Sequence, residues 1–342
     1  MSETVRLARF AAHSTLRCMI DVEMPPAEQY AAIARRWFDA GFSVLAPKQR
    51  ATLQTGPKLP PEAIRRPMPC GPPGATWGFV SVTRYFPKQV TKAGRQIYTI
   101  KKSDRVWSPA SWKWFLGQLA DPPHDATLGT AHLEDAGSRS PGYPEDPRIR
   151  MTTWRPKELP GWLRLAFSAA ESDLNDPERQ QSWLGFVRES VDDLNPAFGI
   201  IDYEYDYLYG ETAVEATTRG VGLFPAEEIP RSRELLRGYD WLTICPQELA
   251  ERLGGAEALR GTSAFHEVAQ LPGGGVWLLA TADYRDYDEA ATDRVFRALA
   301  PVLPAGQPVQ VNPKEAEQGR DYRIVYQDAA AVRPATTCKA TS

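Results

Sequence analysis

The sequence predicts an α+β protein with mixed or antiparallel sheets flanked by amphipathic helices. Several segments alternate between apolar and polar residues, as β-strands do, and others carry apolar residues every three or four positions, as helices do. A third observation is the turn Pro272-Gly273-Gly274-Gly275 between two strand-like runs, which is typical of a hairpin. With 342 residues, 42% of them hydrophobic, the chain is long enough to bury a sizeable core.

The first elements are a strand over residues 5–22 and a helix that follows Pro25-Pro26. Gly41 is expected to cap the end of this helix, and its buried face is carried by Tyr30, Ile33, Ala34, Trp37 and Phe38. Residues 48–73 are rich in Pro, Arg and Gly and predict a long loop. The elements expected next are strands at 77–86 and 95–106, a helix at 111–119 and a strand at 126–133.

The second half of the chain has a more regular pattern. A capping residue before Pro177 begins a helix whose buried face includes Trp183 and Phe186. Around it we expect strands at 148–154, 162–169 and 198–205. Towards the C-terminus we expect a short helix at 231–236, a strand at 240–245, a helix at 247–253 closed by Gly254, strands at 265–271 and 276–281, a helix at 288–299 and a strand at 322–326.

Residues 120–148 are rich in Pro, Gly and Asp around the strand expected at 126–133, and the loop part of this segment is the best candidate for a domain boundary. We therefore predict a basic N-terminal α+β region over residues 1–120, which includes the loop at 48–73. A second α+β domain is expected over residues 121–312. Residues 313–342 are expected to form a partly flexible C-terminal tail.

The net charge is only −3, but the charges are unevenly distributed. Residues 42–119 hold thirteen Lys or Arg and two acidic residues, whereas residues 171–215 hold twelve acidic residues and two Arg. The two regions would therefore produce electrostatic fields of opposite sign, which influence the choice of binding partner and do not determine the fold. The sequence lacks a signal-peptide pattern and a long apolar run, and its four cysteines are scattered. These features predict a cytoplasmic chain with free thiols that does not enter a membrane.

Motifs for metal, phosphate or nucleophilic chemistry are weak. His124 and His132 flank Asp125, but the four histidines have no metal-ligand spacing, so we expect no metal and no cofactor. Cys245 precedes a helix start that could lower the pKa of its thiol, with His266 as a base. The neighbours of Cys245 are apolar, which favours a buried cysteine instead. No catalytic residue is therefore predicted.

The run from Asp202 to Tyr207 alternates acidic and aromatic residues, which a strand would place on opposite faces. Three acids on one face could face a basic partner, hold a metal or serve a carboxylate-dependent hydrolase. A solvated edge strand with buried tyrosines is an equally good interpretation. Protein recognition is the favoured function, and the candidate partner-binding residues are Asp202, Tyr203, Glu204, Tyr205, Asp206, Tyr207, Tyr239 and Trp241.

The basic segment at 42–119 carries aromatic residues among its cations, as in Arg105, Trp107 and Trp112. Cations interleaved with aromatics can bind nucleic acid through phosphate contacts and base stacking. The alternatives are that the tryptophans belong to the core, or that this surface docks on the acidic half of the same chain. Nucleic acid is therefore the less favoured partner.

The segment from Leu236 to Trp241, followed by Cys245-Pro246-Gln247-Glu248-Leu249 and Leu253-Gly254-Gly255, resembles a pattern in bacterial polymorphic-toxin immunity proteins. These are type VI secretion immunity proteins of the DUF3396 and immunity-52 groups. The resemblance covers roughly residues 126–305, and the basic N-terminal region departs from it. It implies an α+β fold and neutralisation of a cognate protein toxin by direct binding. Apart from the resemblance, if the tyrosines of the run at 202–207 belong to the core, the main contacts are expected elsewhere, near Tyr239 and Trp241.

Overall fold

The computed structural model describes residues 15–55, 75–91, 96–133, 144–206, 211–212, 228–308 and 324–332. The chain forms two compact units, Met1–Asp192 and Asp193–Ser342. The boundary that the sequence suggests between residues 120 and 121 lies inside the first unit.

Six strands of the first unit pair side by side in the order β1-β6-β5-β4-β2-β3, and each of these pairings is antiparallel. Chain positions on both sides of residue 120 meet here, because β2 pairs with β3 along one edge and β4 along the other. The strands are β1 (Thr15–Glu23), β2 (Thr76–Val90), β3 (Gln96–Val106), β4 (Asp125–Leu133), β5 (Pro144–Trp154) and β6 (Trp162–Ala170).

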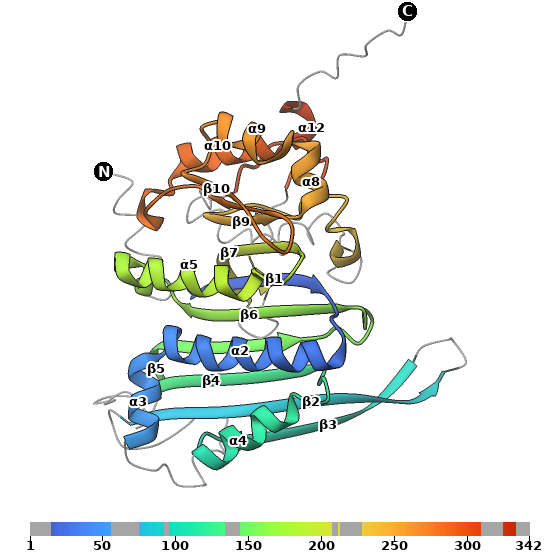
Figure 1. Cartoon of the computed structure of the whole chain (residues 1–342), viewed down its shortest axis with the longest axis vertical. Coiled ribbons are helices and arrows are strands. Elements are labelled where there is room, and N and C mark those ends of the chain that lie inside the picture. Colours follow the sequence, from blue (N-terminus) through green and yellow to red (C-terminus); the bar gives the residue numbers. More distant parts are fainter. Residues whose placement is uncertain are drawn as a thin grey trace, which may run out of the picture. The chain divides into compact units, whose positions relative to one another are not determined.

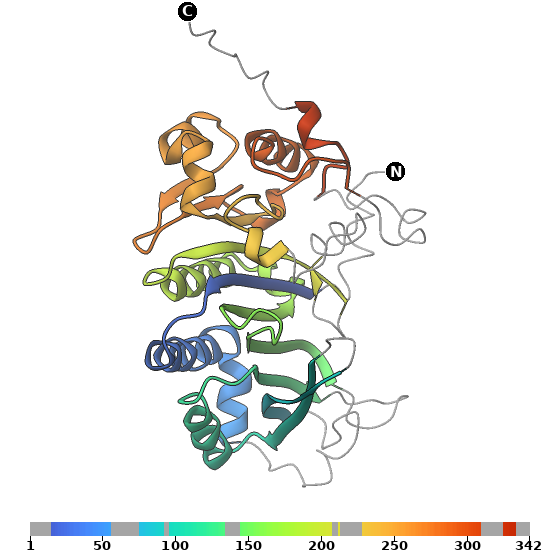
Figure 2. The same ribbon diagram turned by 90° about the vertical axis from the view of Figure 1, so that its right-hand side faces the viewer.

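Helices lie along one face of these strands (Figure 2). The helical segments of the first unit are α2 (Ala27–Leu45), α3 (Pro47–Thr55), α4 (Pro109–Gln118), the 3₁₀ turn η2 (Glu171–Asn175) and α5 (Pro177–Val191). Their core is aromatic: Trp37 of α2 lies 4.8 Å from Phe186 of α5 and 6.1 Å from Phe167 of β6, measured between ring centroids. The buried positions expected for both helices are confirmed.

The end of α2 differs from the prediction. The helix continues past Gly41 to Leu45, so Gly41 is an interior residue and not a cap. A Cβ atom at this position would lie 2.1 Å from Met151 Cε and 2.7 Å from Phe186 Cζ. Glycine therefore serves close packing of α2 against the sheet and α5. Part of the predicted loop is also helical, because Pro47–Thr55 forms α3, while residues 56–73 lie outside the described part.

Local sequence signals explain the helix α4. Ser108 Oγ accepts a hydrogen bond from Ser111 N at 3.0 Å, and Ser111 Oγ accepts one from Ser108 N at 2.7 Å. This reciprocal capping box, with Pro109 in the first turn, satisfies backbone donors that have no partner inside the helix. The helix predicted at 111–119 is confirmed.

The second unit is built on strands in the order β10-β11-β9-β7, with β8 paired to β7, and these pairings are also antiparallel. Its elements are β7 (Pro196–Asp206), β8 (Glu211–Thr212), η3 (Ile229–Arg231), β9 (Leu242–Cys245), α8 (Gln247–Arg252), α9 (Gly255–Gly261), β10 (Glu267–Gln270), β11 (Val276–Leu279), η4 (Tyr284–Asp286), α10 (Glu289–Leu299) and α12 (Ala329–Val332). Figure 1 shows the helices and strands of both units.

The predicted hairpin is confirmed. Leu271 N donates to Gly275 O at 3.0 Å, and Gly274 and Gly275 have φ values of 113° and 84°, a region that favours glycine. The helix at 288–299 is also confirmed, with Asp288 Oδ1 accepting from Ala291 N at 2.8 Å as its cap.

Three expectations for this unit need correction. Residues 255–261 form α9, a helix that the sequence did not predict, because Gly254 and Gly255 indicated only an end. Only Ile229–Arg231 is a regular turn of helix where one was expected at 231–236. Residues 324–326 are not a strand, and 322–323 lie outside the described part.

The fold is α+β, as predicted. Among the helices that the structure describes, none has both the length and the apolar character needed to cross a membrane.

Candidate functional site

The acidic run lies on β7, whose first half is anchored in the core of the second unit. Ala197, Phe198, Ile200 and Ile201 are buried, and Gly199, Ile200 and Ile201 pair with β9. Gly199 allows this pairing to be close, because a Cβ atom there would lie 2.7 Å from Ile244 Cδ1. The strand predicted at 198–205 is therefore confirmed, because β7 spans Pro196–Asp206.

The second half of β7 pairs with β8 instead. The register places Glu204 opposite Thr212 and Asp206 opposite Glu211, with an irregularity between the two pairs. Acidic residues directly opposite each other on neighbouring strands repel and destabilise the pairing. We call Glu204, Asp206 and Glu211 the acidic ribbon. Tyr203 and Tyr205 lie on the same strand, while Tyr207 lies outside the described residues.

Asp202 differs from the acidic ribbon. It is only 1% exposed, although the residue before it, Ile201, is also buried. Strict alternation of the strand would have placed these two residues in different environments. Asp202 is therefore buried in the isolated chain, and its role as a partner contact stays a prediction.

The other candidate contacts, Tyr239 and Trp241, are 7% and 0% exposed. Trp241 Nε1 donates to Thr281 O at 3.0 Å, and its ring meets Tyr284 edge-on with centroids 5.3 Å apart. Tyr239 Oη accepts a hydrogen bond from Val325 N at 2.9 Å. Both side chains hold the second unit together, and a partner could reach them only if neighbouring segments moved.

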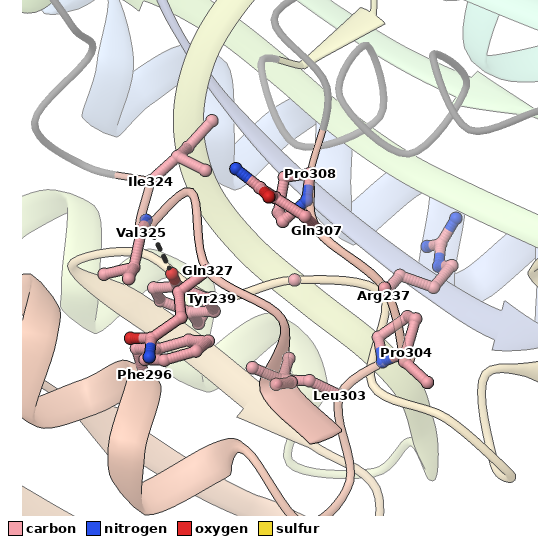
Figure 3. A pocket seen from close by; sticks show the side chains of 14 residues that line it. Arg237, Tyr239, Phe296, Leu303, Pro304, Gln307, Pro308, Ile324, Val325 and Gln327 are labelled. Atoms are coloured by element: carbon pink, nitrogen blue, oxygen red, sulfur yellow. Dashed lines mark hydrogen bonds between the residues drawn. The ribbon is translucent and has the colours of Figure 1, made fainter. Parts of the chain in front are cut away.

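Tyr239 also lines a small pocket of about 80 Å³ together with Phe296, Leu303 and Val325 (Figure 3). Ligand sites for small molecules are commonly 300–1,000 Å³, so this volume suits only a few water molecules. Two polar contacts hold the neighbouring segments together: Asp328 Oδ1 accepts from Gly306 N at 2.8 Å, and Gln307 Nε2 donates to Tyr326 O at 3.1 Å. The pocket is a small gap in the packing of residues 324–329 against the neighbouring segments.

Cys245 is a core residue at the end of β9. It is 0% exposed, and burial, with a smaller contribution from the nearby Glu248 carboxylate, raises the pKa of its thiol to about 12. A nucleophilic cysteine needs the opposite shift, towards a thiolate at neutral pH. The geometry therefore favours the interpretation of Cys245 as a buried hydrophobic residue.

His124 is part of a local hydrogen-bond network. Its Nδ1 accepts a hydrogen bond from Tyr85 N at 3.2 Å. Burial lowers the pKa of the imidazole, and the positive charges of Arg155 and Arg84 lower it further. Within the residues that the structure describes, no cluster of three or more His, Cys, Asp or Glu could hold a metal ion.

The basic N-terminal region contains a feature that the sequence did not predict. The strand expected to end at residue 86 continues to Val90, so β2 and β3 form a long two-stranded ribbon. Phe86, Val90 and Ile100 are its exposed apolar residues, at 46%, 61% and 61%. The alternation at 96–100 was the signal available in the sequence, although it could not show which side chains lack a cover.

The tryptophans of this region have divided roles. Trp107 is buried near Phe42, with ring centroids 6.3 Å apart, as the core interpretation expects. Trp114 is partly exposed and carries the guanidinium of Arg105 3.8 Å above its ring, a cation–π contact. Arg105 and Trp114 are a cation and an aromatic residue of the kind expected to bind nucleic acid, and here they contact each other.

Comparison with known proteins gave little. The chain matches no known protein family and no curated protein. Among solved structures, the type VI secretion system (T6SS) protein PA0821 of Pseudomonas aeruginosa aligns with a TM-score of 0.46 and 15% identity, over 88% of this chain and 83% of that one. A similarity at this level supports no inference about fold or role.

Proposed function

We propose that this chain is an immunity-like protein that neutralises a cognate protein toxin by direct binding through an acidic and aromatic surface. The observation that carries the proposal is the register of β7 and β8, which brings Glu204, Asp206 and Glu211 together on two adjacent strands. The register places the backbone positions of two acidic residues, Asp206 and Glu211, opposite each other, and like charges at such positions disfavour the pairing of the free chain. A basic partner would offset this repulsion on binding.

The physics of association favours such a partner. Complementary charges speed the encounter of two proteins and suppress wrong partners, and close charge pairs at an interface couple by about 1.5 to 7 kcal/mol. Tyr203 and Tyr205 alternate with Glu204 along β7, and tyrosine is a residue type that is enriched in interfaces. In the proposed complex the acidic face of the strand orients the partner, and the tyrosine face adds contact area.

The resemblance to immunity proteins rests on the segment from Leu236 to Gly255. Here Leu242–Cys245 forms β9 and Gln247–Arg252 forms α8, which is the strand-then-helix order that the resemblance implies. The aromatic residues of the segment, Tyr239 and Trp241, are buried. This motif therefore supports the proposal through the architecture of the second unit, and the contact surface is assigned to the acidic ribbon.

Growth rescue is the direct test. Each reading frame that neighbours the gene for this chain is expressed alone, and one of them is expected to arrest bacterial growth. Co-expression of the full chain should relieve that arrest, and the two proteins should elute together in size-exclusion chromatography. The variant Glu204→Gln/Asp206→Asn/Glu211→Gln should rescue growth poorly, because the basic partner loses its counter-charges.

A matched control removes the same charge elsewhere. Glu189, Glu251 and Glu289 are exposed helical residues, and their replacement by Gln should leave rescue unchanged. The proposal fails if no neighbouring product arrests growth, if the chain does not relieve the arrest, or if the acidic-ribbon variant rescues as well as the control.

A further inference from the structure

The outer part of the β2–β3 ribbon is a second candidate interaction surface, independent of the acidic ribbon. β2 pairs with β4 only over residues 76–83, whereas its pairing with β3 continues to Val90. Residues 84–90 of β2 and their partners on β3 therefore extend beyond the rest of the sheet, as Figure 1 shows. β3 is the last strand in its sheet and spans 11 residues, Gln96–Val106.

Apolar side chains are exposed on this extension. Among the residues that the structure describes, the large hydrophobics with high exposure are Phe86, Val90 and Ile100, and all three belong to β2 or β3. Ile100 lies directly opposite Tyr85, and Val90 lies opposite Gln96. Exposed apolar residues on an edge strand invite pairing with another chain, and natural proteins normally avoid them.

The two edges of the extension differ. Along β2, Pro87 has no backbone N–H to donate, and the pairing is irregular between Pro87 and Gln89. Both features block the addition of a strand on that side. The sequence of β3 contains no proline, and its pairing with β2 is continuous from Phe79 to Pro87. In the described part of the chain no strand pairs with the edge of β3 that faces away from β2, and this edge lacks the features that block strand addition along β2.

The charges around β3 determine whether an acidic or a basic partner would be attracted. Lys88, Lys101, Lys102 and Arg105 are exposed, and Asp104 balances only Lys102, at 3.3 Å. Lys101 lies opposite Arg84, whose guanidinium contacts Asp121 at 3.2 Å. The surface is therefore positive along the strand. Two copies of β3 would repel each other, whereas an acidic segment would be attracted.

We propose that the outer edge of β3 binds an extended acidic segment of a partner protein by strand addition. Backbone hydrogen bonds along β3 provide the pairing, and side chains at alternate positions of the added strand meet the apolar and basic residues of the ribbon. Lysines alone are a common protection of edge strands against aggregation. Protection against aggregation does not explain the exposure of Phe86, Val90 and Ile100, because exposed apolar residues favour pairing with another chain.

Binding of a labelled peptide of alternating Glu and Val to the full chain tests this proposal, with fluorescence polarisation as the readout. The acidic peptide should bind, and hydrogen exchange of the backbone amides of Gln96–Val106 should slow in its presence. The same peptide with N-methyl groups on alternate residues, which cannot pair along one edge, should not bind. The variant Lys88→Glu/Lys101→Glu should weaken binding by about tenfold or more, from lost charge pairing. Ile100→Thr, which keeps a β-branched residue, should also weaken it.

Arg294→Glu is the matched control, because Arg294 is an exposed residue of α10 in the other unit. Equal binding of a Lys and Val peptide, or unchanged binding of the N-methylated peptide, would overturn strand addition by an acidic segment. Tighter binding of a single-stranded oligonucleotide that competes with the peptide would assign the surface to nucleic acid. A dimer of the free chain that Ile100→Thr dissociates would assign it to a second copy. Each of these results is separate from growth rescue by the acidic ribbon.

Discussion

Asp21 and Arg164 form a buried ion pair whose removal should strongly destabilise the first unit. They are opposite each other on β1 and β6, 1% and 5% exposed. Arg164 Nε donates to Asp21 Oδ1 at 2.7 Å and Nη2 donates to Oδ2 at 3.0 Å, while the guanidinium lies 5.3 Å from the ring centre of Trp154. Asp21→Ala leaves a buried cation without its carboxylate, which typically costs about 3–5 kcal/mol.

The double variant Asp21→Val/Arg164→Met should recover most of that loss, because replacing both charges with apolar residues removes the desolvation penalty together with the attraction. Urea unfolding followed by tryptophan fluorescence measures the difference, since eight of the ten tryptophans lie in the first unit. Asp104→Ala, which breaks the exposed pair with Lys102, is the control and should cost about 0–1 kcal/mol. A cost for Asp21→Ala as small as that of the control would refute the reasoning.

Three further outcomes are expected. Burial raises the pKa of Asp125, against a hydrogen bond from Thr127 and nearby cations that lower it, so the folded state holds the proton more tightly than the unfolded state. Asp125→Asn should therefore stabilise the chain at neutral pH, and this gain in stability should shrink as pH falls through the raised pKa. Urea unfolding at several pH values measures the gain. A gain in stability that grows towards acidic pH would contradict the upward direction of the pKa shift. In a chain whose other two cysteines are replaced by Ser, Cys18 and Cys245 should not react with a thiol reagent until urea unfolds the protein, since both thiols are buried and their pKa values are raised. Tyr239→Phe removes the acceptor of Val325 N–H, so it should cost about 1 kcal/mol and speed proteolysis within residues 324–332, whereas an unchanged cleavage rate would mean that the segment is held by other contacts.

Local patterns in the sequence predict much of the fold. The buried face of α2, the cap of α10 and the glycine turn between β10 and β11 each follow from residues only a few positions apart. The end of α2 was missed because the role of Gly41 depends on Met151 and Phe186, which are distant in sequence. The α9 helix was missed because glycine in the left-handed region both ends one helix and permits the next, as Gly254 does at φ 87°.

The candidate site was harder to predict, because exposure depends on tertiary packing. The alternation of residues 202–207 indicated a strand, but not that Asp202 is buried or that Asp206 lies opposite Glu211. Tyr239 and Trp241 were expected as contacts on account of their residue type, yet the same large rings fill the core of the second unit. The ribbon of β2 and β3 was missed because nothing local shows that β4 ends its pairing at Thr83.

The salt dependence of partner affinity tests the central claim, that the acidic ribbon binds a basic protein. Titration calorimetry compares the wild-type chain with Glu204→Gln/Asp206→Asn/Glu211→Gln, using the growth-arresting product of the neighbouring gene as ligand. Loss of even one close charge pair should weaken binding by about tenfold at low salt. The variant should also lose less affinity than the wild type as salt increases, because fewer charges remain to be screened. Equal affinity and equal salt dependence of the two proteins would contradict the assignment of the acidic ribbon as the binding surface.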